Sequence, residues 1–123
     1  MNLHEPFKDL APMITRRRLV LEGLTTEQIP QKDINSYMIE LSSTMNMTIV
    51  SPPTFNYDAD YGDSAYMCWK ESGMHVYTWS KTETRPHFFS IDIYICKDFE
   101  IKDVLQCTSD KFKDILTDLT WRE

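Results

Sequence analysis

The sequence predicts a single small domain in which helices and strands are combined. A chain of 123 residues is long enough to bury about two thirds of its unfolded surface around one core, and it is too short for two independent cores. Apolar residues recur with helical spacing in two stretches and follow strand patterns in several others. Residues 1–14, which include Pro6 and Pro12, show neither period and are expected to form an irregular lead-in.

A strand and then a helix are expected in the first part of the domain. Residues 17–23 contain the β-favouring run Leu19–Leu21 and end at a glycine, which predicts a first strand. In residues 32–46 four apolar side chains recur at steps of three and four residues, which predicts an amphipathic helix: Ile34, Met38, Leu41 and Met45. Asp33 in the first turn and Asn46 at the end are residue types that suit helix ends.

The middle of the chain is expected to begin with a short strand and a loop. Residues 47–50 predict a brief strand that Pro52 and Pro53 would end, because proline lacks the amide hydrogen that a sheet requires. The next residues, 54–63, are rich in aspartate and turn formers. They predict an acidic loop that either binds a ligand or is simply mobile.

Three consecutive strands are expected next, in residues 64–70, 74–80 and 88–97, with a tight turn at residues 71–73. Strand side chains alternate, so one face of the third strand is apolar throughout: Phe89, Ile91, Ile93 and Ile95. On these strands another face gathers polar and aromatic side chains: Ser64, Tyr66, Cys68, His75, Tyr77, Trp79, Phe88, Ser90, Asp92, Tyr94 and Cys96. We expect helices to cover the apolar face, and we expect the second face to form an interface or a pocket.

The C-terminal part predicts a second helix in residues 100–112, with four side chains pointing inward: Ile101, Val104, Leu105 and Phe112. Residues 115–121 then fit a last strand. A single helix that continues to Leu119 fits the spacing nearly as well, so both alternatives remain open.

Composition argues against several classes of partner. The net charge of -6 opposes binding to nucleic acid, and the only basic cluster, Arg16–Arg18, is expected at a solvated strand end. No run of 18 apolar residues predicts a membrane span, and the N-terminus lacks the layout of a signal peptide, so we expect a cytoplasmic protein. The three cysteines and three histidines lack the spacing of a disulfide framework or a metal site, so neither is expected.

Two stretches in the second half of the chain carry a distinctive pattern. The first begins Glu71-Ser72-Gly73 and closes with Tyr77-Thr78-Trp79, and the second runs from Asp92 through apolar residues to Cys96. The pattern resembles the core of the bacterial S-adenosylmethionine decarboxylase family. The family has Glu-Ser-His, an apolar strand closing with His-Thr-Trp-Pro-Glu, and an Asp-apolar run ending at Cys. The likeness extends more faintly over most of the chain.

This resemblance implies that the chain cleaves itself between residues 71 and 72. The Ser72 hydroxyl would attack the Glu71 carbonyl, the peptide would become an ester, and β-elimination would leave a pyruvoyl group on residue 72; no metal is implied. The ketone of a pyruvoyl group forms a Schiff base with a substrate amine and accepts the electrons released as CO2 leaves. A tight, strained turn at residues 71–73 would help the hydroxyl to reach the carbonyl.

By the same matching, Ser64 takes the place of the family's processing serine, and Cys96 takes that of its proton donor. A cysteine thiol ordinarily has a pKa of about 8.5 and holds its proton at neutral pH, which suits that role. Tyr77 stands where the family has the histidine that promotes elimination, and a phenol with an ordinary pKa of about 10 is a poor base. His75, two residues away on the same strand face, is a candidate substitute base.

Two further departures concern the substrate pocket. Gly73 replaces the family's histidine after the serine, and Ser80 and Lys81 replace its Pro-Glu pair. The family's glutamate binds the ribose of S-adenosylmethionine, and a lysine cannot accept those hydrogen bonds. Glu83, in a loop that is longer than the family's, is a candidate replacement.

The resemblance implies an α+β fold, in which an antiparallel sheet carries two helices on one face and dimerises sheet to sheet into an α/β/β/α sandwich. It implies a self-processing, pyruvoyl-dependent decarboxylase that acts on S-adenosylmethionine for spermidine synthesis. Decarboxylation of ornithine or arginine is an alternative, which the loss of the ribose carboxylate favours. A second alternative is a non-cleaving binding or regulatory homologue, which Gly73 and Tyr77 favour.

Overall fold

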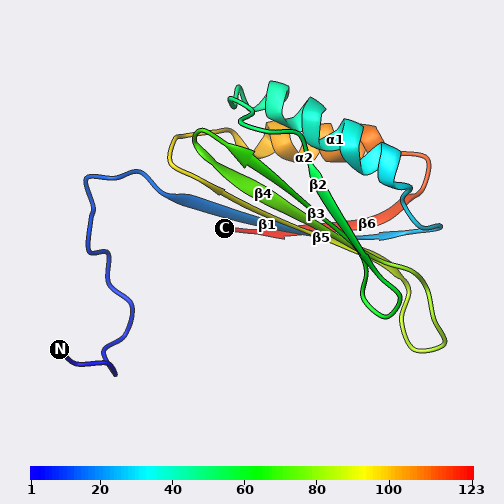
Figure 1. Cartoon of the computed structure of the whole chain (residues 1–123), viewed down its shortest axis with the longest axis horizontal. Helices are drawn as coiled ribbons and strands as arrows, with labels where there is room; N and C mark the ends of the chain where they lie inside the picture. Colours follow the sequence, from blue (N-terminus) through cyan, green and yellow to red (C-terminus); the bar gives the residue numbers. More distant parts are fainter.

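The computed structural model describes residues 1–123, and most of these form an antiparallel sheet with two helices on one face (Figure 1). The six strands are β1 (Arg17–Thr25), β2 (Thr54–Asp58), β3 (Gly62–Trp69), β4 (Ser72–Trp79), β5 (His87–Ile95) and β6 (Leu116–Arg122). Their order across the sheet is β2-β3-β4-β5-β1-β6. The α+β fold with both helices on one face is therefore confirmed.

The face of the sheet beneath the helices is apolar because side chains alternate along each strand. In β5 the alternate residues Phe89, Ile91, Ile93 and Ile95 are each at most 1% exposed, as the sequence predicted. Leu19 and Leu21 of β1 and Met74 of β4 join them in the core. The opposite residues of the same strands remain partly exposed, so the two faces differ sharply in burial.

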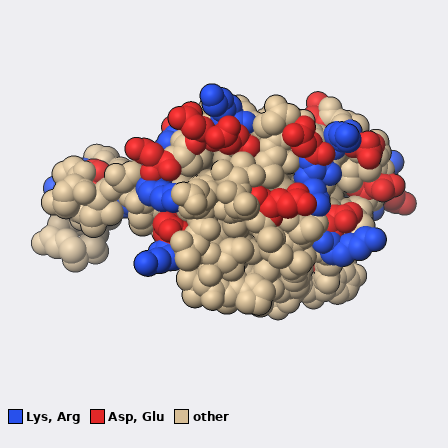
Figure 2. Space-filling model, turned by 90° about the horizontal axis from the view of Figure 1, so that it is seen from above, with Lys and Arg blue, Asp and Glu red and all other residues tan.

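Two amphipathic helices close the core. Helix α1 (Gln31–Thr44) buries Ile34, Tyr37, Met38 and Leu41, and helix α2 (Ile101–Phe112) buries Val104 and Phe112. Both predicted helices are confirmed to within two residues at each end. The Phe112 ring contacts both Tyr37 and Phe89, with centroids 5.1 and 5.7 Å apart, and so joins the helices to the sheet. Acidic and basic groups are interspersed on the helix side (Figure 2).

The C-terminal segment is a strand, and the alternative of one continuous helix is wrong. Helix α2 ends at Phe112, and β6 pairs antiparallel with β1, where Leu21 is opposite Trp121. Pairing with β6 covers the edge that β1 would otherwise present unpaired to solvent. This long-range pairing stabilises the strand. It decides between a last strand and a continued helix, which local spacing could not distinguish.

Two expectations for residues 47–63 are wrong. Residues 47–50 are not a strand, and Ile49 makes only an isolated bridge to Trp69. The segment predicted as an acidic loop contains β2, which pairs with β3 from Thr54 opposite Tyr66. Pro52 and Pro53 separate these two contacts, because neither proline can donate a hydrogen bond to β3.

Residues 1–16 form neither helix nor strand and extend away from the sheet (Figure 1). They join the domain at the start of β1, where Arg17 pairs with Ile95 of β5. Neither α1 nor α2 has the length and apolar character needed to cross a membrane.

Candidate functional site

The face of the sheet opposite the helices carries a row of neighbouring rings, and we call it the bare face because no other part of the chain covers it. The rings of Tyr66, His75, Tyr77, Trp79 and Phe88 follow one another with centroids 4.5, 5.7, 6.0 and 5.2 Å apart. Three of the five come from alternate positions of β4. The sequence predicted this clustering of aromatic and polar groups on one face.

Ser72 lies at one end of the bare face, where the β3–β4 hairpin turns. Lys70 and Glu71 form the turn, and Trp69 is opposite Ser72 in the register. Short hairpin turns usually need a positive φ within the turn. Here that angle falls at Ser72, whose φ is 135°. A serine in such a conformation is strained by about 1–3 kcal/mol. The expected strain is present, although the turn begins one residue earlier than predicted.

The side chains of Ser72 and Cys96 contact each other, although 24 residues separate them in the sequence. The Ser72 Oγ lies 3.3 Å from the Cys96 Sγ. The backbone amide of Cys96 donates a hydrogen bond of 2.9 Å to the carbonyl oxygen of Glu71. Such a donor stabilises negative charge on a carbonyl oxygen under attack. A hydroxyl, a thiol and a polarised carbonyl thus meet at one point.

The side chain of Glu71 fastens the hairpin to the segment that follows α1. Its carboxylate accepts hydrogen bonds from the Thr48 amide at 2.9 Å and from the Thr48 hydroxyl at 3.2 Å. The hydrogen bond from the Thr48 backbone amide is the main reason that the pKa of Glu71 is lowered, and the charge of Lys97 acts in the same direction. The turn before Ser72 is therefore held at its backbone and at its side chain.

A cavity of about 290 Å3 opens beside Ser72 on the bare face, and we call it the Ser72 pocket. Its lining consists of Arg18, Tyr66, Ser72, Gly73, His75, Asp92 and Tyr94. The Arg18 guanidinium lies 4.8 Å from the centre of the Tyr94 ring. The Oδ1 atom of Asp92 is buried without a hydrogen-bond partner, which leaves one acceptor free for a ligand. The pocket therefore offers a cation, a carboxylate and aromatic walls.

Sequence reasoning named none of Arg18, Asp92 and Tyr66 as a site residue, although it expected the face that carries Tyr66 and Asp92 to form an interface or a pocket. Alternation along the strands placed Tyr66 and Asp92 on the correct face, but strand register was needed to bring them to Ser72. Tyr66 leans over Gly73, since a Cβ at residue 73 would lie 3.1 Å from the Tyr66 hydroxyl. Partial burial raises the pKa of Tyr66, so the hydroxyl remains protonated at neutral pH.

Ser64 and Tyr77 lie away from Ser72 in the same chain. They are directly opposite each other in the pairing of β3 with β4. Tyr77 is five residues along β4 from Ser72, roughly 16 Å at about 3.3 Å per residue. Both line a second cavity of about 440 Å3 together with Trp79 and the β2–β3 hairpin. Of the two candidate bases, only His75 belongs to the Ser72 pocket.

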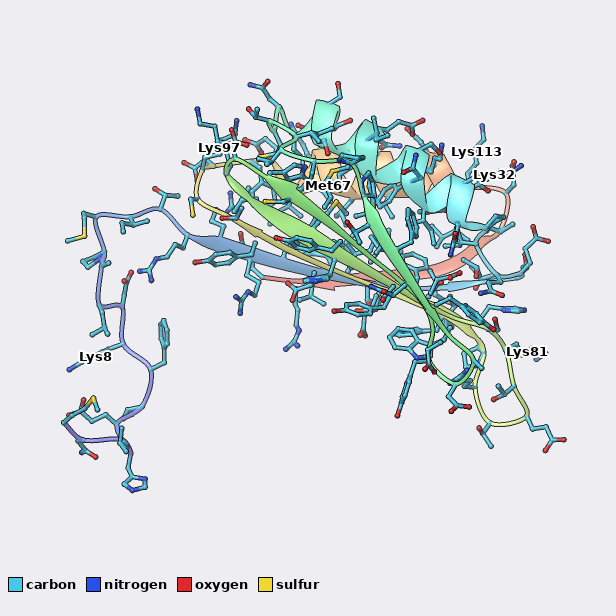
Figure 3. All side chains as sticks on the ribbon, viewed as in Figure 1. Lys8, Lys32, Met67, Lys81, Lys97 and Lys113 are labelled. Atoms are coloured by element: carbon cyan, nitrogen blue, oxygen red, sulfur yellow. The ribbon has the colours of Figure 1, made fainter.

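Lys81 and Glu83 are exposed in the loop between β4 and β5. Figure 3 shows Lys81 at one end of the sheet and Lys97, which follows Cys96, at the other. Neither Lys81 nor Glu83 therefore reaches the Ser72 pocket of its own chain.

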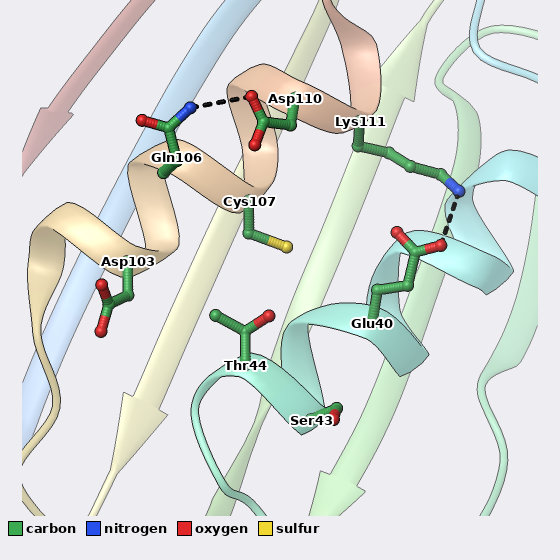
Figure 4. Close-up of a pocket in the computed structure, with 8 residues that line it drawn as sticks. All are labelled: Glu40, Ser43, Thr44, Asp103, Gln106, Cys107, Asp110 and Lys111. Carbon is green, nitrogen blue, oxygen red and sulfur yellow. Dashed lines mark hydrogen bonds and ion pairs between the residues drawn. The ribbon is translucent and has the colours of Figure 1, made fainter.

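A hollow of about 640 Å3 lies between the two helices, on the other side of the sheet (Figure 4). Its polar side chains pair with one another, with Lys111 3.1 Å from Glu40 and Gln106 2.8 Å from Asp110. Burial raises the pKa of the Cys107 thiol, which makes it a weaker nucleophile. None of the predicted site residues lies there.

A comparison with protein-family models matches residues 22–120 to the model described as S-adenosylmethionine decarboxylase. The matched region begins within β1 and ends within β6, so it spans most of the sheet, both helices and every residue that lines the Ser72 pocket except Arg18. A search of curated proteins finds no match.

Proposed function

Because the chain belongs to the S-adenosylmethionine decarboxylase family, we propose that it is a self-processing, pyruvoyl-dependent decarboxylase. The single observation that carries this proposal is the 3.3 Å contact between Ser72 Oγ and Cys96 Sγ. The family resemblance assigns the pyruvoyl group to the first residue and the proton donor to the second. The fold brings these two residues together from separate hairpin and strand ends.

The surroundings of Ser72 fit the formation of a pyruvoyl group. The Ser72 Oγ would attack the Glu71 carbonyl carbon and lose its proton, and the Ser72 nitrogen would gain one as the peptide bond breaks, giving an ester. Residue 72 would then lose its α-proton, and the ester would break to release the new main-chain carboxylate of Glu71, which leaves dehydroalanine. Addition of water with loss of ammonia would give the pyruvoyl group. The Cys96 amide supports the first step, because it donates to the Glu71 oxygen on which charge develops.

The pyruvoyl group would supply a ketone that takes up the substrate amine and a carbonyl that accepts electrons as CO2 departs. The chain's own residues would do the rest. The Cys96 thiol, in contact with residue 72, would hold the proton that replaces CO2 on the substrate carbon. His75, in the same pocket, is the proposed base for the elimination step.

We further propose a homodimer in which two bare faces meet, giving the α/β/β/α sandwich. The aromatic row on the uncovered face supports this arrangement. The positions of Ser64 and Tyr77 support it as well. Since both lie roughly 16 Å along the sheet from Ser72 of their own chain, any part they take in processing would act on a second copy.

S-adenosylmethionine is the first substrate to test, because it is the substrate that the family implies. The product would serve as an aminopropyl donor for spermidine synthesis. Ornithine and arginine are the second candidates, because Lys81 stands where the family's ribose-binding glutamate is expected. Glu83 could replace that carboxylate only across a dimer interface, given its distance from the Ser72 pocket of its own chain.

Denaturing mass spectrometry of fresh and day-old protein tests the proposal. We expect fragments of residues 1–71 and 72–123, the second carrying a pyruvoyl end, and we expect the matched variant Ser72→Ala to remain whole. His75→Ala should accumulate full-length or ester-linked chain. A wild-type chain that stays intact with an unmodified serine would contradict self-processing and would favour the alternative of a binding or regulatory homologue.

A further inference from the structure

Tyr66 and Gly73 form a complementary pair in the wall of the Ser72 pocket. A Cβ atom on residue 73 would lie 2.7 Å from the Met67 carbonyl oxygen, 3.1 Å from the Tyr66 hydroxyl and 3.3 Å from Cε2 of the Tyr66 ring. The backbone of β3 and the Tyr66 ring together occupy the space that a side chain at residue 73 would need. On the other side the ring packs on His75, with centroids 4.5 Å apart. The Tyr66 ring is thus fixed between two residues of β4.

The position of this ring limits the volume of the pocket. The cavity measures about 290 Å3. Sites for drug-sized molecules usually measure about 300–1,000 Å3, so the part of the site that one chain supplies is small. Tyr66 is 40% exposed, and it lines the cavity. S-adenosylmethionine carries a whole nucleoside beyond its amino-acid part, whereas a free amino acid needs far less room.

The charges of the pocket suit a free amino acid with a basic side chain. The Arg18 guanidinium can pair with a carboxylate, and the unpartnered Oδ1 of Asp92 can accept a hydrogen bond from an ammonium or guanidinium group. Asp92 also belongs to the pattern of the whole family, so its charge alone does not select between substrates. The feature of the wall that bears on size is the Tyr66 ring, which lies over Gly73.

We propose that Tyr66 is a specificity-determining residue that restricts the Ser72 pocket to a free basic amino acid and excludes S-adenosylmethionine. This inference rests on the proposed decarboxylase function and selects between its two candidate substrates. The ring acts by its size, and Gly73 makes its position available.

Calorimetric binding to the uncleavable variant Ser72→Ala tests the inference without any need for catalysis. We expect ornithine or arginine to bind at least tenfold more tightly than S-adenosylmethionine. Adding Tyr66→Ala should raise the affinity for S-adenosylmethionine at least tenfold, and Tyr66→Phe, which keeps the ring, should leave both affinities unchanged. Ile39→Ala is the control, because Ile39 is 44% exposed on α1 and lies on the other side of the sheet, away from both cavities of the bare face.

Thermal unfolding of each variant checks that the domain remains folded, and Tyr66→Thr provides a second small residue that suits a strand. Tighter binding of S-adenosylmethionine to the parent variant would overturn the inference, as would unchanged affinities in both Tyr66→Ala and Tyr66→Thr. An effect of Tyr66→Phe as large as that of Tyr66→Ala would show that the hydroxyl, and not the size of the ring, decides. A chain that binds amino acids selectively but never cleaves would contradict only the decarboxylase function.

Discussion

The backbone of Ser72 sets this serine apart from the other serines of the chain, because its φ of 135° is positive. Strain at this residue raises the energy of the intact chain relative to a cleaved one, in which the peptide bond to Glu71 no longer fixes that angle. The adjoining contacts with Cys96 prevent the hairpin from relaxing: one joins the side chains, and the other holds the Glu71 carbonyl. Strain and contact together favour the proposed cleavage at this bond.

The strain predicts an unusual order of stability among variants. Ser72→Gly should be more stable than Ser72→Ala by about 1–2 kcal/mol, because glycine adopts a positive φ without steric cost. Urea denaturation of the two uncleaved proteins measures this difference. Ser90 in β5 provides the control, because its φ is not positive and glycine should there be less stable than alanine. The same order at both positions would show that Ser72 is not strained.

The Glu71 carboxylate makes the hairpin sensitive to acid. Because its hydrogen bonds from Thr48 lower the pKa of Glu71, its contribution to stability is fully present above the unfolded value of about 4.3. It is lost as the pH falls through the lower folded value. We expect amide hydrogen exchange of residues 70–73, corrected for intrinsic rates, to become less protected between pH 5 and pH 3. Glu71→Gln should remove this pH dependence, and a hairpin that loosens equally in both proteins would contradict it.

At the scale of elements, a buried polar contact joins α1 to β3. The Trp69 indole donates to the Ser42 hydroxyl at 2.7 Å, and Ser42 donates onward to the Met38 carbonyl at 2.6 Å. Both side chains are at most 2% exposed. Ser42→Ala should therefore destabilise the domain by about 1–3 kcal/mol, since it leaves the indole N–H buried without an acceptor. Chemical denaturation measures the loss, and exposed Ser43→Ala is the control on the same helix. If both substitutions lowered the free energy of unfolding equally, the hydrogen bond between Trp69 and Ser42 would not be a determinant of stability.

Elements with a regular apolar period were predictable from the sequence, and the exposed edge strand β2 was not. Helix α1 and strand β5 bury one complete face, so local spacing reports their packing. Strand β2 is an edge strand with four of its five residues exposed, and only its pairing with β3 makes it a strand. The site divides in the same way. The resemblance placed Ser72 and Cys96 at one site, whereas the place of Tyr66 over Gly73 follows from register between two strands.

At the scale of the whole molecule, one face of the sheet is covered by the helices and the other is uncovered. The helices cover the apolar residues of the central strands on one face, and the other face presents its aromatic row together with partly exposed apolar residues such as Val20 and Leu24. Both cavities that contain predicted site residues open on this bare face. Covering it with a second copy would bury the aromatic row. It would also bring the cavity with Ser64 and Tyr77 of one chain toward the Ser72 pocket of the other.

A charge on the bare face should therefore dissociate the dimer without unfolding the chain. In a Ser72→Ala background we expect sedimentation at twice the 14.5 kDa of one chain, and Val20→Lys should shift this to the single-chain mass. Val20 is only partly buried and lies opposite Asp92, so the lysine can extend to solvent in the monomer. Ile39→Lys is the control, because Ile39 is 44% exposed on α1 and lies on the helix side. A monomeric parent protein, or dissociation by Ile39→Lys alone, would contradict a sandwich formed through the bare faces.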